Sequence, residues 1–125
     1  MKTSELIGPA LDWAVAKCEG LNPKVVGGLV REVHQVFGPV LEYSTDWAQG
    51  GPIIEREIYR LFRNVGGTFT AQIKIRVPYY SPTYAADIGR SEVISCAGPT
   101  PLIAAMRCYI ASKLGDEVEI PEELR

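Results

Sequence analysis

The chain has 125 residues, of which 46% are hydrophobic and 22% charged, so its length and composition suit one globular domain rather than a disordered or disulfide-stapled chain. Thirteen Lys and Arg residues against fifteen Asp and Glu residues give a formal net charge of −2, which argues against a broad surface for duplex nucleic acid. No apolar run approaches the ~20 residues of a membrane-spanning helix, so we predict a single domain over residues 1–125 that has neither duplex nucleic acid nor a membrane as a partner.

The first predicted element is a helix over residues 3–19, which Gly20 ends. Its apolar residues recur four positions apart, as on one face of a helix. Pro9 conflicts with a continuous helix, because proline lacks the backbone donor that a helix interior uses. Either the first turn is distorted, or the regular helix begins at Gly8 and Pro9 occupies a first-turn position that tolerates it.

The next segment is ambiguous. Residues 21–43 fit helical spacing in part, but their valines and a Gly-Gly pair favour extended structure with a turn at Gly38-Pro39. Residues 43–51 are typical of a loop. Pro52 suits the first position of a helix, and the apolar spacing predicts that this helix runs to about Asn64.

The following residues predict an antiparallel sheet. A turn at Gly66-Gly67 leads into residues 69–77, which alternate apolar and polar side chains as a half-buried strand does. Pro78 ends this strand, and residues 78–90 are expected to form a tyrosine-rich loop. Residues 92–96 predict a second strand, and an exposed edge there would allow two copies of the chain to pair.

The last predicted helix has the clearest boundaries. Thr100 suits the cap, Pro101 the first position and Gly115 the position after the end. Residues 116–125 form an acidic C-terminal tail. The whole pattern predicts an α+β fold, a single small domain in which an antiparallel sheet packs against about three helices.

The residue types argue against common catalytic centres. The chain has one histidine, His34, and three cysteines without a CxxC pair, so no metal site or cofactor is expected. It also lacks a GxSxG elbow and the usual nucleotide-binding loops, and we assign no catalytic residues. No secretion signal precedes the first helix, which together with the odd cysteine count predicts a cytoplasmic location.

Two strings that lead into predicted helices are the best candidates for a binding site. They are residues 47–52 and residues 98–101. A helix start carries unpaired amides and a partial positive charge, so it attracts anions, although turns and caps alone would also produce such strings. The candidate ligand-binding residues are Tyr43, Asp46, Trp47, Gln49, Gly50, Gly51, Glu55, Arg56, Thr100 and Arg107.

Three blocks of this sequence, residues 11–20, 43–57 and 98–116, are similar to the NinX family of lambdoid phages. They occur in the same order as in the family and cover about a third of the chain. The resemblance implies a small phage accessory protein in the bacterial host cytoplasm, and it assigns no catalytic residues. Both helix-start strings belong to the blocks, which favours a shared pocket.

Three functions follow as hypotheses. The leading one is a non-enzymatic binder, or sponge, of a small anionic or nucleotide-like ligand, which would suit counteraction of host defence signalling. The first alternative is a protein-interaction module that contacts a host or phage factor through residues 79–84 and the acidic tail. The second is a hydrolase-like enzyme that uses Glu55 or Asp46 as its base.

Overall fold

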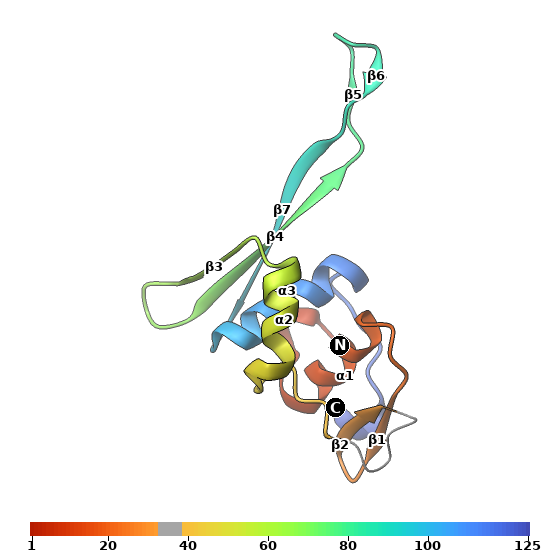
Figure 1. Ribbon diagram of the computed structural model, residues 1–125, viewed down its shortest axis with the longest axis vertical. Helices are drawn as coiled ribbons and strands as arrows, with labels where there is room; N and C mark the ends of the chain where they lie inside the picture. The colour runs from red at the N-terminus through yellow and green to blue at the C-terminus, as the bar shows by residue number, and fades with distance from the viewer. Residues whose placement is uncertain (33–38) are drawn as a thin grey trace.

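The computed structural model describes residues 1–32 and 39–125, and it has the predicted α+β architecture. Three layers follow one another (Figure 1). A three-stranded antiparallel sheet is covered on one face by α3 (Pro101–Leu114), and α1 (Gly8–Cys18) and α2 (Trp47–Glu57) pack against α3. No helix in the described part of the chain is both long and apolar enough to cross a membrane.

The N-terminal segment resolves the conflict at Pro9. A short 3-10 turn, η1 (Thr3–Glu5), comes first, and the regular helix α1 begins at Gly8 with Pro9 in its first turn. The helix ends at Cys18, and Gly20 follows with a φ of 78°, a conformation that glycine adopts without strain. The Thr3 hydroxyl donates to the Gly115 carbonyl at 2.7 Å, which ties the N-terminal segment to the end of α3.

Extended structure is confirmed for part of residues 21–43. Strand β1 (Pro23–Val26) pairs with β2 (Leu29–Glu32) through the Gly27-Gly28 turn, where both φ angles are positive. The predicted turn at Gly38-Pro39 involves Gly38, and both Gly38 and His34 lie outside the described residues.

The second helix differs from its prediction at both ends. Helix α2 begins at Trp47, because the Asp46 carboxylate accepts the Ala48 amide at 2.9 Å and caps the helix, so Pro52 lies inside it. It ends at Glu57, since Ile58 is already extended. The prediction of a loop to residue 51 and a helix to residue 64 was therefore wrong.

The main sheet has the order β3-β4-β7. Strand β3 (Arg60–Arg63) occupies residues that were predicted as helix, because they pair with the central strand β4 (Phe69–Val77). The bounds of β4 are those predicted. Strand β7 (Arg90–Gly98) extends beyond the predicted 92–96 at both ends, and it lies at an edge of the sheet, as pairing between copies would require.

The residues between β4 and β7 form a projecting arm rather than a simple loop. Within residues 78–90, β5 (Tyr80–Ser81) pairs with β6 (Ala86–Asp87), so the β4–β7 ribbon continues into a small hairpin. This arm extends far from the helical layers (Figure 1). We use the term arm for residues 76–91.

Helix α3 forms the centre of the core. Its predicted cap, Thr100, accepts the Ile103 amide at 3.1 Å, and most residues of its middle turns are buried. In the acidic tail, Val118 and Ile120 are buried, and a last 3-10 turn, η2 (Glu122–Leu124), follows them.

Candidate functional site

The two strings singled out in the sequence meet at one pocket of about 220 Å³. The first turns of α2 and α3 contribute to its wall, because both helices begin there. We call it the helix-start pocket; its lining residues are Ser44, Thr45, Trp47, Thr100, Pro101, Leu102 and Ile103.

The pocket combines an open aromatic ring with a buried hydroxyl. The Trp47 side chain is 55% exposed, so one of its faces is available to a planar ligand. Ser44 is only 2% exposed, and its Oγ has no hydrogen-bond partner in the part of the chain that the structure describes. An unpaired buried hydroxyl costs free energy, so a ligand that reached it would gain a hydrogen bond.

Several predicted site residues support the pocket without lining it. The Gln49 amide donates to the Val40 carbonyl at 3.0 Å, and its oxygen accepts the Glu42 amide at 2.8 Å. Gly50 is buried against Leu102, where a Cβ atom would lie 2.6 Å from the Leu102 Cδ2 atom. Tyr43 is buried in the core. These side chains fix the segment that leads into α2.

The two predicted arginines are engaged elsewhere. The Arg56 guanidinium donates to Glu19 at 2.6 Å and lies over the ring of Tyr109. The Arg107 guanidinium donates to the carbonyls of Leu6 at 2.8 Å and Ala97 at 3.0 Å. No Lys or Arg is among the described residues that line the pocket. Any anion bound there would rely on backbone amides and hydroxyls.

The predicted acidic residues have different surroundings. Asp46 is occupied as the cap of α2, where it also accepts a hydrogen bond from Gln49 at 3.3 Å. Glu55 is exposed on α2, and Gly51 is half-buried beside Trp47. Within the described residues, no three His, Cys, Asp or Glu side chains lie where they could hold a metal ion.

Asp12 is a buried acid that the sequence analysis missed. Its Oδ1 accepts the amide of Ser44, a residue that lines the helix-start pocket, at 2.8 Å. Burial raises the pKa of the Asp12 carboxyl to about 6, although the hydrogen bond from Ser44 opposes this shift and Glu42 reinforces it. The signal was present: Asp12 falls between Leu11 and the buried alanines of the same helix, where a charge is unusual.

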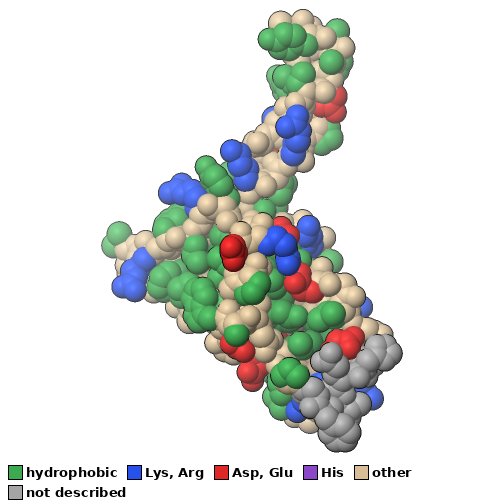
Figure 2. Space-filling model, in the orientation of Figure 1, with side chains coloured by type: hydrophobic (Ala, Val, Ile, Leu, Met, Phe, Trp, Pro, Cys, Tyr) green, Lys and Arg blue, Asp and Glu red, His purple; other side chains and the backbone are tan. Residues whose placement is uncertain are grey.

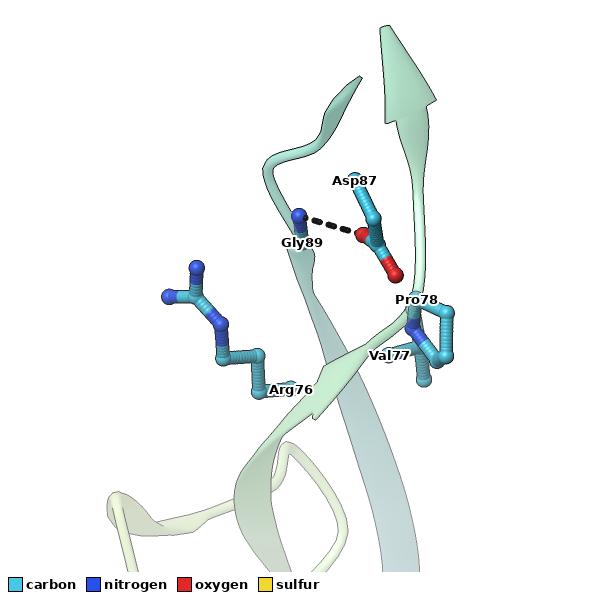
Figure 3. Close-up of a pocket in the computed structure, with 5 residues that line it drawn as sticks. All are labelled: Arg76, Val77, Pro78, Asp87 and Gly89. Atoms are coloured by element: carbon cyan, nitrogen blue, oxygen red, sulfur yellow. Dashed lines mark hydrogen bonds between the residues drawn. The ribbon is translucent and has the colours of Figure 1, made fainter.

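The neck of the arm is held by the Asp87 carboxylate and by two further hydrogen bonds. The Ile88 amide donates to the Tyr79 carbonyl at 3.0 Å, and the Arg76 guanidinium donates to the Ile88 carbonyl at 2.6 Å. Pro78 has no amide to donate, so the ladder between the strands is interrupted there. The Asp87 Oδ1 accepts the amides of Tyr79 and Gly89, both at 2.9 Å, and these bonds lower the pKa of its carboxyl. Figure 3 shows the hydrogen bond between Asp87 and Gly89, with Arg76 on the side of Gly89 away from Asp87; these residues line a pocket of about 320 Å³.

The tip of the arm is aromatic and open. Tyr80 and Tyr84 are 63% and 72% exposed, and Tyr79 and Ile88 are also exposed. Figure 2 shows mainly hydrophobic side chains at this tip, whereas Lys and Arg side chains follow the sheet into the lower part of the arm. The sequence indicated the tyrosines, but it gave no sign that they would be carried so far from the core.

Comparison with known proteins identifies the family. The model of the family described as Bacteriophage P22, NinX matches residues 2–113. None of the curated proteins matches the sequence. The match spans most of the chain; it contains the first two blocks that carried the resemblance and the third block as far as residue 113. This protein therefore belongs to the NinX family and is a phage accessory protein.

Proposed function

We propose that this protein is a non-enzymatic interaction module that contacts a host or phage protein through the tip of its arm. The observation that carries the proposal is the position of Tyr80 and Tyr84 on a hairpin that projects from the domain (Figures 1 and 2). Tyrosine is enriched at protein interfaces, because it offers a large contact area and a polar end at little cost in conformational entropy.

The arm is poorly supported by the rest of the chain. The side chains of Ala71 and Ile73 are buried under α3, but beyond Ile75 the strands leave the helical layer. An isolated two-stranded hairpin is at best marginally stable in water. A partner that covers the tip would bury its tyrosines and stabilise the hairpin, while the Asp87 hydrogen bonds give the tip a shape before binding.

The proposal is tested by capture from phage-infected cells, followed by binding measurements with the purified partner. We expect one stoichiometric partner that is lost with the double variant Tyr80→Ser, Tyr84→Ser and with deletion of residues 79–84. The matched control is Val65→Ser, which removes an exposed apolar side chain outside the arm. A partner that binds the double variant and the control equally well would contradict the proposal.

A small ligand in the helix-start pocket is the second candidate. Its support is the combination of the exposed Trp47 ring and the unpaired Ser44 hydroxyl in one concavity. Drug-sized ligands occupy pockets of about 300–1,000 Å³. The pocket volume of about 220 Å³ therefore suits a small anion, or one end of a nucleotide that extends beyond the pocket.

Thermal-shift titration with inorganic phosphate and with cyclic and linear nucleotides tests this candidate. A ligand at 100 times its dissociation constant stabilises the folded state by about 2.7 kcal/mol. We expect Trp47→Ala to abolish the shift, whereas Trp13→Phe, a change of a tryptophan that lines a different pocket, leaves it intact. The absence of any shift at millimolar ligand would count against this candidate and leave the proposal for the arm unaffected.

A further inference from the structure

We infer that the uncovered face of the β3-β4-β7 sheet binds single-stranded nucleic acid. Helix α3 lies on one face, where Ala71 and Ile73 are buried. Alternate residues point to the opposite face, on which no helix of the described chain packs. We call it the open face; its exposed residues include Arg60, Phe62, Lys74, Arg76, Val93 and Ser95.

The open face is positively charged although the chain as a whole is not. Three cations, Arg60, Lys74 and Arg76, lie on it, and none of the strand residues that share it is Asp or Glu. Within the described residues, neither Arg60 nor Lys74 forms an ion pair. The acidic Glu92 of β7 pairs with Arg90 at 2.6 Å on the other side of the ribbon. A chain with a net charge of −2 thus concentrates positive potential on this surface.

Exposed aromatic rings lie among these cations. Tyr59 and Phe62 are 55% and 37% exposed. The Lys74 Nζ lies 5.1 Å from the centroid of the Tyr59 ring, and the Arg60 guanidinium lies 5.0 Å from that of Phe62. In each pair the cation lies over the ring, so a base that took its place on the ring would bring its phosphate within reach of the displaced cation.

Single strands fit this arrangement better than the other anionic polymers do. An uncovered sheet face with exposed aromatic rings accepts bases that are splayed out, whereas a duplex keeps its bases stacked inside. Three cations are also few for the dense phosphates of a duplex. An acidic protein segment would use the cations but would leave Tyr59 and Phe62 without stacking partners. The inference goes beyond the proposed function, because the open face and the tip of the arm are separate surfaces.

Fluorescence anisotropy with a short labelled oligothymidylate and the full chain tests the inference. We expect binding that weakens as salt rises and that is tighter than binding to a duplex of the same length. Replacing both cations, as Arg60→Ala with Lys74→Ala, is expected to weaken binding at least about tenfold and to flatten the salt dependence. Tyr59→Ser is expected to weaken it at least about fivefold, and Tyr59→Phe to preserve it, since stacking needs only the ring.

The controls separate this surface from the rest of the chain. Arg90→Ala removes a cation from the other side of the same ribbon and is expected to leave binding unchanged. The arm variant Tyr80→Ser, Tyr84→Ser is also expected to bind oligothymidylate normally, whatever it does to a protein partner. Circular dichroism melts confirm that each variant is folded. The inference is overturned if the native chain does not bind oligothymidylate at low salt, if the double cation variant binds it as tightly, or if an acidic polyglutamate peptide binds more tightly than the oligonucleotide.

Discussion

Replacing the buried Asp12 with asparagine is expected to stabilise the protein at neutral pH. The carboxyl has a pKa of about 6 in the folded chain against 3.8 for an ordinary Asp. Each pH unit between these values is worth about 1.4 kcal/mol, so keeping Asp12 ionised in the folded state costs about 3 kcal/mol. Asparagine keeps an oxygen for the Ser44 amide, which Asp12 accepts at 2.8 Å, and carries no charge.

The sign of the pH dependence follows from the raised pKa. The folded protein holds this proton more tightly than the unfolded chain does. The contribution to the free energy of unfolding is therefore complete below pH 3.8, falls as the pH rises to about 6, and stays low above that. At pH 7 we expect Asp12→Asn to be more stable than the native chain by about 1–3 kcal/mol, because burial of the new amide group offsets part of the gain. Near pH 4 most of this difference disappears.

Urea denaturation followed by circular dichroism at pH 7 and pH 4 measures both differences. Other carboxyl groups titrate over the same range, so the quantity of interest is the difference between the variant and the native chain at each pH. Glu5→Gln, which neutralises an exposed carboxylate of η1, is the control and is expected to stay within about 0.5 kcal/mol at both values. The reasoning is refuted if Asp12→Asn is no more stable than the native chain at pH 7, or if its advantage is the same at pH 4.

Three further substitutions test the packing, the cap and the neck of the arm. Gly50→Ala places a Cβ atom 2.6 Å from Leu102 and from a backbone oxygen, and we expect a loss of about 1–3 kcal/mol in urea denaturation; Gly51→Ala, whose Cβ has an open site in the same helix, is expected to gain about 0.5–1 kcal/mol. Thr100→Ala removes the cap of α3 and is expected to cost about 1 kcal/mol in the same assay, whereas Thr100→Ser costs less. Two amides lower the pKa of Asp87, so the hydrogen bonds of this carboxylate to the arm weaken as the pH falls through that pKa. Asp87→Asn is expected to speed hydrogen exchange of the Tyr79 and Gly89 amides at neutral pH. Unchanged exchange would show that other bonds protect these amides.

Local sequence patterns predicted the bounds of an element correctly where they favoured only one kind of secondary structure. Strand β4 was predicted to the residue, because strict alternation over residues 69–77 has no helical counterpart. Helix α2 was misplaced, because Pro52 was preferred to Asp46 as the start signal, although Asp46 and Gln49 have the spacing of a capping box. Its C-terminal limit depends on pairing between β3 and β4, which a local pattern does not contain.

The candidate sites depended on longer-range packing. The two helix starts share a pocket because Gly50 lets α2 approach Leu102 of α3, a contact between residues far apart in the sequence. The extent of the arm was also hidden. Pro78 correctly predicted the end of β4, but Asp87 bridges the gap that the proline leaves, so the hairpin continues past it.

The distribution of cations indicates where this protein meets other molecules. In the helical layers, the Arg56 guanidinium donates to Glu19 and Tyr109, and that of Arg107 donates to two backbone carbonyls. Both side chains therefore stabilise the fold. On the open face, Arg60 and Lys74 lie over exposed rings and form no ion pair within the described residues. Side chains that contribute little to the fold are free to serve binding. Substitutions in the first group are therefore expected to lower the melting temperature before they affect any ligand, and substitutions in the second to change binding at constant stability.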